Sequence, residues 1–199
     1  MSRPPWVDSY KKGASAPVRV EVVDQLFPTP PELAARMVEL AQIKPGRRVL
    51  EPSAGTGALV WAIQDAKVEC QVVAVEVNRL LAHCLEDEAI RRTKLFPTPP
   101  THTTVRCDDF LTLTEADLGP FDVALANPPF KNGVDVQHVQ HMIHFVKPGG
   151  RIVSLCAAGS RQQHALVPLA SRIEWVEDAF KSVGTGVRVA LLVIDKCAA

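Results

Sequence analysis

The chain has 199 residues, of which 47% are hydrophobic and 22% charged, the composition of a soluble globular protein with room for one domain. Its 22 basic and 22 acidic residues cancel, which excludes a whole-molecule field as the basis of nucleic-acid binding. No apolar run reaches the roughly 18 residues of a membrane span and the N-terminus lacks a signal peptide's apolar core, which predicts a cytoplasmic protein without membrane contact.

The N-terminal segment differs in composition from the rest of the chain. Residues 1–17 are rich in Pro, Ser, Gly and Lys without a hydrophobic period, which predicts a flexible arm, and 18–199 are predicted to form a single domain. The first helix is predicted to start with Thr29 as its N-cap, Pro30 at the first helical position and Glu32 completing a capping box.

Beyond this helix, short apolar runs alternate with helical patterns. The runs predict strands at 49–50, 72–77, 104–107, 123–126, 152–155, 173–176 and 187–194. Helices are predicted between them at 57–66, 79–91 and 134–146. This alternation favours an α/β fold with a doubly wound, mostly parallel seven-stranded sheet. Because no helix separates the last two strands, they are expected to close the sheet as an antiparallel hairpin.

A glycine turn follows the first predicted strand, in Glu-Pro-Ser-Ala-Gly-Thr-Gly at 51–57. Gly55 and Gly57 would let the backbone pass close to a ligand, and the helix that follows offers free N–H groups. No Lys-Ser or Lys-Thr follows the glycines, which excludes a phosphate-binding P-loop. The position three residues after Gly57 is Val60, where a dinucleotide-binding motif has Gly or Ala, so the segment matches that motif poorly. Glu51 would repel a pyrophosphate but suits a cationic amino group.

Two further carboxylates follow predicted strands. Glu76 comes at the end of one strand, where it could accept from both hydroxyls of a ribose. Asp109 follows the next strand and could accept from an adenine amino group, with Phe110 beside the ring. The carboxyl ends of the strands form the edge where doubly wound sheets bind ligands, so the three carboxylates predict one nucleotide-like site.

The sequence Asn127-Pro128-Pro129-Phe130 directly follows an apolar strand. Two prolines fix the backbone and remove two donors, which leaves the Pro128 carbonyl and the Asn127 carboxamide oxygen free to accept. Two convergent acceptors suit a planar NH2 group, and Phe130 could stack on the ring that carries it. The pattern therefore predicts a site that orients an exocyclic amine.

These residues resemble a known family, the N6-adenine branch of the class I S-adenosylmethionine (SAM)-dependent amino-methyltransferases that act on DNA. The 51–57 segment, with Glu51, Ser53, Gly55, Thr56 and Gly57, resembles its SAM-binding motif, and 127–130 its catalytic tetrad. Phe27 and Thr29 resemble the segment that the family places against the methionine end of SAM, Glu76 its ribose ligand and Asp109 its adenine ligand. The segment from Phe180 onward resembles the closing hairpin of that branch. The resemblance implies a SAM methyltransferase fold, SAM as cofactor and N6 of adenine in DNA as acceptor.

The chain departs from the family in having no separate target-recognition domain. Nothing but 197–199 follows the last predicted strand, and only the short stretch 110–126 separates Asp109 from Asn127. The family flips its target base out of the duplex, at a cost that contacts to the DNA must offset, and this chain has little surface for such contacts. We therefore expect weak sequence specificity, a homodimer or a specificity partner, or a substrate that is already unpaired. Local basic patches that could contact nucleic acid lie at 44–48 and 91–94 and in the N-terminal arm.

Other functions use similar residues. The tetrad also resembles that of methyltransferases acting on guanine amino groups in ribosomal RNA and on a glutamine amide in protein release factors. A non-catalytic binding or regulatory protein with this fold is a further alternative, although it would not need an intact tetrad. A nicotinamide dehydrogenase is disfavoured by Glu51 and by the tetrad.

No metal site is predicted. The cysteines are five in number, widely spread and without a C-x-x-C pair, so they indicate buried thiols: Cys70, Cys84, Cys107, Cys156 and Cys197. His138, His141 and His144 recur every third residue, whereas metal ligation favours i, i+4 spacing, so they predict a polar helix face. Alternatively, Asp135 and His138 could brace the loop that carries Phe130.

Overall fold

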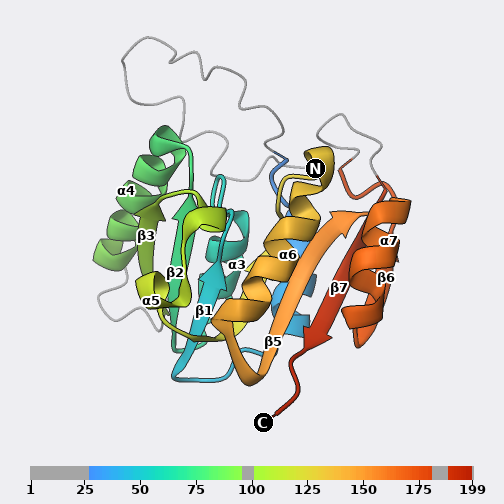
Figure 1. Ribbon diagram of the computed structural model, residues 1–199. Helices are drawn as coiled ribbons and strands as arrows, with labels where there is room; N and C mark the ends of the chain where they lie inside the picture. Colours follow the sequence, from blue (N-terminus) through green and yellow to red (C-terminus); the bar gives the residue numbers. More distant parts are fainter. Residues whose placement is uncertain (1–26, 96–100, 181–187, 199) are drawn as a thin grey trace.

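The computed structural model describes residues 27–95, 101–180 and 188–198, so the predicted arm at 1–17 lies outside the described residues. The described residues contain one seven-stranded sheet with the order β3-β2-β1-β4-β5-β7-β6 (Figure 1). Its strands are β1 (Arg47–Glu51), β2 (Cys70–Glu76), β3 (Thr101–Cys107), β4 (Phe121–Ala126), β5 (Val146–Ala157), β6 (Arg172–Val176) and β7 (Val189–Asp195).

Strands β1 to β5 pair in parallel, whereas β7 pairs antiparallel with both β5 and β6. The predicted fold, a mostly parallel doubly wound sheet closed by an antiparallel C-terminal pair, is confirmed. Strands β1 to β6 are longer than the apolar runs that predicted them, whereas β7 is one residue shorter than the predicted 187–194. The largest difference is at β5, which begins six residues before its predicted start at Ile152. The strand starts at the buried Val146, but residues 147–151 are partly or fully exposed and polar or small, so they do not form the apolar run on which the prediction depended.

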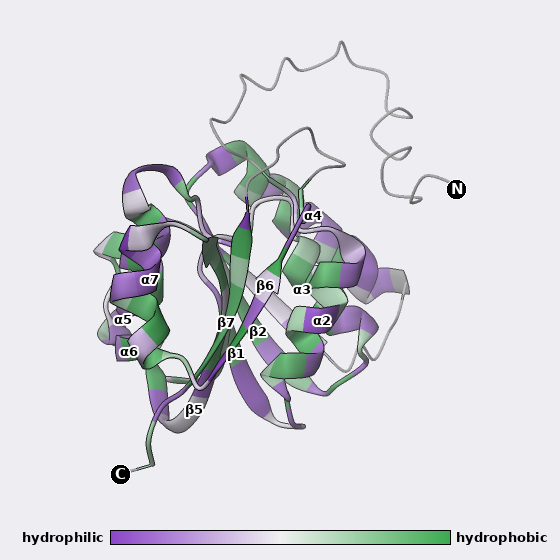
Figure 2. Cartoon of the chain, turned by 90° about the vertical axis from the view of Figure 1, so that its right-hand side faces the viewer, coloured by the Kyte–Doolittle hydropathy of each residue, from purple (hydrophilic) through white to green (hydrophobic). Residues whose placement is uncertain are grey.

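Helices cover both faces of the sheet (Figure 2). On one face lie α2 (Pro31–Ala41), α3 (Ala58–Asp65) and α4 (Arg79–Leu95), and on the other α5 (Glu115–Leu118), α6 (Val134–Phe145) and α7 (Ser160–Leu166). Neighbouring strand residues therefore enter different cores: Val49 and Leu125 pack towards α2 and α3, and Leu50 and Ala124 towards α6. Short 3-10 turns are η1 (Phe110–Thr112), η2 (Lys131–Gly133) and η3 (Val167–Leu169).

The start of α2 differs from the predicted capping box. The helix begins at Pro31 with Pro30 as its N-cap, and no side chain caps it. Thr29 lies outside the helix, is buried, and accepts a hydrogen bond from Asn127 instead. The predicted N-cap was wrong because a tertiary contact uses the hydroxyl that the local pattern assigned to the helix.

The cysteine prediction holds for two of the five residues. Cys70 and Cys156 are buried free thiols, but Cys84, Cys107 and Cys197 are free and exposed. Cys84 lies on α4 and Cys107 ends the edge strand β3, so both occupy positions that the cores do not cover. Among the described residues, no helix is long and apolar enough to cross a membrane.

Candidate active site at the carboxyl edge of the sheet

The structure brings the three predicted carboxylates and the tetrad to one edge of the sheet. Glu51 and Glu76 are the last residues of β1 and β2, and Asp109 and Asn127 follow β3 and β4. These four strands are parallel neighbours, so their carboxyl ends meet at the same rim. This rim is the ligand-binding edge of doubly wound sheets.

Glu76 links the ends of three strands. It is 7% exposed, and its carboxylate accepts from the backbone N–H of Gly55 at 2.7 Å and of Asn78 at 2.8 Å. The N–H of Asp108 donates to the Glu76 carbonyl at 3.2 Å. Glu76 therefore fixes the glycine turn after β1 against the start of α4, and each of its oxygens keeps a lone pair for a further donor.

Glu51 is a buried carboxylate with one unused oxygen. It is 1% exposed; its Oε1 accepts from the backbone N–H of Ser53 at 3.0 Å and lies 3.4 Å from the Ser53 hydroxyl. Its Oε2 has no hydrogen-bond partner among the described residues. Burial, with nearby Glu76 adding to it, raises the pKa of Glu51 to about 8 although the bonds from Ser53 oppose the shift. A cationic donor at Oε2 would stabilise the charged form.

The glycine turn passes from β1 into α3 through two left-handed residues, Gly55 (φ 54°) and Gly57 (φ 84°). Between them the Thr56 carbonyl accepts from the indole N–H of Trp61 at 3.1 Å. Gly57 is the N-cap of α3, and a Cβ there would lie 2.5 Å from Trp61 Nε1 and 2.6 Å from Leu85 Cδ2. The turn can follow this path only with glycine at 57.

Gly57→Ala is therefore expected to destabilise the fold by about 2 to 4 kcal/mol, combining left-handed strain with overpacking. Gly149→Ala is the matched control, because Gly149 has a similar φ of 75° but open space where its Cβ would go. Its expected cost is about 1 to 2 kcal/mol, from strain alone. Urea unfolding of both variants measures the difference, and equal losses would show that the close approach at Gly57 is unimportant.

Asp109 and Phe110 lie at the end of β3 in different environments. Asp109 is exposed and is the N-cap of η1, where its Oδ1 accepts from the N–H of Leu111 at 3.0 Å. Phe110 is 2% exposed, and its ring contacts the rings of His138, His141 and Phe145. Its side chain thus offers almost no accessible surface to a ligand, and its role in cofactor binding stays a prediction.

Asn127 is oriented by a segment that lies 98 to 100 residues earlier in the chain. Its Nδ2 donates to the carbonyl of Phe27 at 2.9 Å and to the hydroxyl of Thr29 at 3.1 Å. Because the nitrogen is committed to these two acceptors, the carboxamide oxygen is left to accept from another group. The structure therefore joins the segment at Phe27 and Thr29 to the tetrad, whereas the placement of this segment against the methionine end of SAM stays a prediction.

Phe180 is a site residue that the motif did not identify. It is fully buried, and its ring centroid lies 5.9 Å from that of Phe27 and 6.0 Å from that of Phe130. Pro128 is buried, whereas Pro129 and Phe130 are partly exposed. Phe180 therefore packs between the two segments that flank Asn127. Only the resemblance of the segment that begins at Phe180 pointed to this region.

The three histidines of α6 do not form a polar face. His138 is 7% exposed, its Nδ1 lies 3.0 Å from the carbonyl of Val134, and burial lowers its pKa. His141 Nε2 lies 2.9 Å from the carbonyl of Leu113, and only His144 is exposed. The prediction failed because η1 covers this side of α6. No cluster of three or more His, Cys, Asp or Glu residues suitable for a metal ion occurs within 27–95, 101–180 and 188–198.

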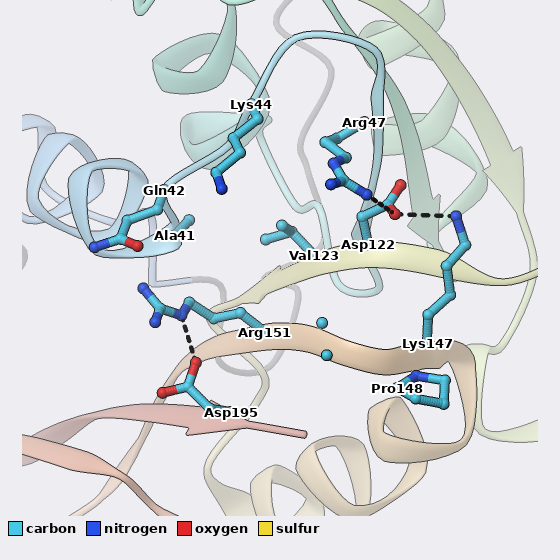
Figure 3. Close-up of a pocket in the computed structure, with 12 residues that line it drawn as sticks. Ala41, Gln42, Lys44, Arg47, Asp122, Val123, Lys147, Pro148, Arg151 and Asp195 are labelled. Carbon is cyan, nitrogen blue, oxygen red and sulfur yellow. Dashed lines mark hydrogen bonds and ion pairs between the residues drawn. The ribbon is translucent and has the colours of Figure 1, made fainter. Parts of the chain in front are cut away.

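A polar hollow of about 320 Å³ lies at the opposite edge of the sheet (Figure 3). It includes two cations of the basic patch at 44–48, Lys44 and Arg47. Arg47 and Lys147 both donate to Asp122, and Arg151 to Asp195. Because three of its cations are already paired with carboxylates, the hollow is a salt-bridged rim, and it contains none of the predicted site residues.

No family model matches the chain. A curated relative, the rRNA N(6)-adenosine-methyltransferase metl-5 of Caenorhabditis elegans, is 28% identical over 172 residues. The match covers 78% of this chain and 73% of that protein. It therefore includes most of both sequences.

The solved structures that are similar to the chain include TrmN and ErmE. TrmN from Thermus thermophilus matches with a TM-score of 0.66 and 23% identity over 83% of this chain, which spans 48% of TrmN. The 23S rRNA methyltransferase ErmE matches with a TM-score of 0.61 and 19% identity, covering 86% of this chain and 70% of that protein. These likenesses confirm the predicted SAM methyltransferase fold.

Proposed function

We propose that this class I SAM-dependent amino-methyltransferase, with SAM as its cofactor, transfers a methyl group to N6 of adenine in RNA. One observation carries the proposal: Asn127 is held by Phe27 and Thr29 so that its carboxamide oxygen is left to accept. It lies at the same rim as Glu51, whose Oε2 lacks a partner among the described residues. An amine acceptor and a cationic ligand can thus be bound side by side.

The acidic half of the site fits SAM. The unpartnered Glu51 Oε2 suits the ammonium of the methionine moiety, the remaining lone pairs of Glu76 suit ribose hydroxyls, and Asp109 suits the adenine amine. The N–H groups of the glycine turn and the carbonyl of Phe27 would complete the set. When bound, SAM supplies a methyl group already activated by a sulfonium, so the protein needs no nucleophile of its own.

The tetrad would hold the acceptor amine. Asn127 Oδ1 and the Pro128 carbonyl would each accept one N–H of the NH2 group, and Phe130 would stack on the base. With both protons held, the nitrogen lone pair is directed out of the plane of the base. The methylated nitrogen would carry a positive charge and would lose one of these protons to solvent, because the neutral oxygens that accept from it are too weakly basic to keep the proton. Orientation of this kind is worth on the order of 7 to 11 kcal/mol of barrier lowering.

Two observations favour RNA over DNA: the name of a relative, and the short connection between Asp109 and Asn127. The relative metl-5 is named as an enzyme of rRNA adenosine. Between Asp109 and Asn127 only η1, α5, β4 and short turns occur, so no inserted module is available there to extrude a base from a duplex. An adenine already unpaired in folded RNA avoids the few kcal/mol that extrusion costs.

Adenine in DNA is the second candidate, because the Glu-Pro-Ser-Ala start of the glycine segment and the tetrad resemble the DNA branch. A local basic patch, a second copy of the chain or a specificity partner would then have to supply the duplex contacts, since the net charge is zero. The tetrad also resembles that of enzymes that methylate guanine in rRNA or glutamine in proteins. The amino groups of these two substrates would donate to the same two oxygens, those of Asn127 and Pro128.

Transfer of a tritiated methyl group from SAM to matched pools of rRNA, DNA and protein tests the proposal. We expect label in rRNA, recovered after nuclease digestion as N6-methyladenosine. Label in N6-methyldeoxyadenosine would support the second candidate, and label in methylguanosine or methylglutamine would contradict both. SAM binding without transfer to any pool would indicate a non-catalytic binding protein.

A further inference from the structure

We infer that the first turn of α7, through Arg161 and Gln162, positions the tetrad by fixing the chain where it leaves Phe130. The inference rests on the proposed function. The entry to the tetrad is held by β4 and by the bonds from Asn127 to Phe27 and Thr29. Two prolines deprive the tetrad of backbone donors, so its exit needs support from elsewhere.

Asp135 is the centre of this support. It is the second residue of α6, only five positions after Phe130, and it is fully buried. It has no ion-pair partner in the described part of the chain and is satisfied by hydrogen bonds alone. Its Oδ1 accepts from the N–H of Val136 at 3.0 Å, and its Oδ2 from the N–H of Ala157 at 2.9 Å. A buried carboxylate is tolerated only when it is well bonded, so this contact defines the position of α6.

Gln162 supplies the remaining bonds. Its Nε2 lies 3.0 Å from Asp135 Oδ1 and 2.9 Å from Oδ2, and the side chain is 7% exposed. Ala157 ends β5 and Gln162 lies on α7, so the carboxylate joins the helix that follows the tetrad to both of these elements. Figure 1 shows α6 and α7 on the same face of the sheet, on either side of β5.

Arg161 holds the short segment between Phe130 and Asp135. Its Nη1 donates to the carbonyl of Asn132 at 2.6 Å. Asn132 (φ 57°) and Gly133 (φ 79°) are consecutive left-handed residues, a conformation that asparagine and glycine adopt more readily than other residues. A Cβ at Gly133 would lie 2.5 Å from Arg161 Nη1 and 2.8 Å from its Cδ. The arginine thus covers this left-handed turn and donates a hydrogen bond to it.

Arg161 and Gln162 are therefore assigned as positioning residues that do not touch the substrate. If they only stabilised the packing of α6 and α7, their loss would lower the folded fraction and leave turnover per folded molecule unchanged. If they position the tetrad, their loss lowers kcat while SAM affinity is kept, because Glu51 and Glu76 belong to other strands. A displacement of about 1 Å at a reacting group can cost as much as 100-fold in rate.

Single-turnover methylation, SAM titration calorimetry and thermal unfolding of Gln162→Ala and Arg161→Met test the assignment. Arg161→Met keeps the aliphatic cover over Gly133 but removes the bond to Asn132. We expect the rate to fall by about 10- to 100-fold in each, with the SAM Kd within about twofold of the unmodified chain. Arg161→Lys should restore most of the rate, since it restores a donor. Gln163→Ala is the control, because Gln163 is exposed on the same helix and its side chain donates to the Ala158 carbonyl, away from Asp135 and Asn132.

Hydrogen–deuterium exchange of residues 130–136 gives a readout that needs no substrate. Faster exchange there in Gln162→Ala and Arg161→Met, but not in Gln163→Ala, would support the assignment even if the chain methylates none of the tested pools. Unchanged exchange together with unchanged turnover in both variants would overturn it. A fall in turnover that only follows the folded fraction would overturn it as well.

Discussion

Asn127→Ala is expected to abolish methyl transfer, with a loss of at least about 1,000-fold in kcat, while the SAM Kd changes by less than about threefold. The substitution removes the carboxamide oxygen that is proposed to accept from the amine, at a side chain whose nitrogen donates to Phe27 and Thr29. It leaves Glu51 and Glu76 untouched, because they end β1 and β2 and are held by the glycine turn. Steady-state kinetics with saturating SAM and calorimetric titration of SAM measure the two effects separately.

Two further variants distinguish the acceptor role of Asn127 from its role in packing. Asn127→Asp keeps an oxygen acceptor but loses the donor to Phe27 and Thr29, so it should be as inactive as the alanine variant. Thr29→Val removes only one of the two anchors and should lose about 10-fold, with recovery in Thr29→Ser. If Asn127→Ala turned over normally, the amine would be bound elsewhere and the proposed chemistry would be wrong.

Glu51→Gln is expected to weaken SAM binding by about 10- to 100-fold, because a hydrogen bond to a charged group is worth about 1.5 to 3 kcal/mol. The same substitution should stabilise the chain without SAM at pH 8, since it removes a buried carboxylate with an unpartnered oxygen. Thermal unfolding with and without SAM should therefore show opposite signs for the two effects. A loss of stability under both conditions would assign Glu51 a purely structural role.

The pH dependence of this effect follows from the raised pKa of Glu51, about 8 in the folded chain against an ordinary value near 4.5. Between these values the unfolded chain has released the proton and the folded chain still holds it. The free energy of unfolding therefore falls as pH rises through this window, by up to about 1.4 kcal/mol per pH unit from this group. The Tm advantage of Glu51→Gln should grow from pH 5 to pH 8.

SAM binding should also release a proton near pH 7, because its ammonium favours the ionised form of Glu51. Titration calorimetry in two buffers that differ in ionisation enthalpy measures this release. We expect nearly one proton at pH 7 in the unmodified chain and a much smaller release in Glu51→Gln. Equal release in both would mean that Glu51 does not face the cofactor.

Much of the fold and half of the site could be predicted from the sequence because their signals are local. Apolar runs at regular intervals indicated the strands, and in a parallel sheet the residues that follow such strands must meet at one rim. Glu51, Glu76, Asp109 and Asn127 could therefore be assigned to one edge from their positions after strands. The closing antiparallel pair was predictable because no helix separates its strands.

The parts that could not be predicted depend on contacts between segments far apart in the chain. The local sequence predicts that the hydroxyl of Thr29 caps a helix, and only the fold shows that it accepts a hydrogen bond from Asn127 instead. Gln162 and Arg161 belong to no recognisable motif. They contact Asp135 and Asn132 because β5 places α7 beside the segment that follows Phe130. The spacing of His138 predicted an exposed side chain, and only the fold shows that the ring of Phe110, from η1, packs against it.

The central claim is that one rim holds a SAM ammonium at Glu51 and an adenine amine at Asn127. The structure of the chain with S-adenosylhomocysteine and a short adenosine-containing RNA tests it most directly. We expect the amino-acid nitrogen of the ligand within hydrogen-bonding distance of Glu51 Oε2, and adenine N6 within that distance of Asn127 Oδ1 and the Pro128 carbonyl. Binding of either ligand only in the salt-bridged hollow at the opposite edge, with the rim empty, would contradict it.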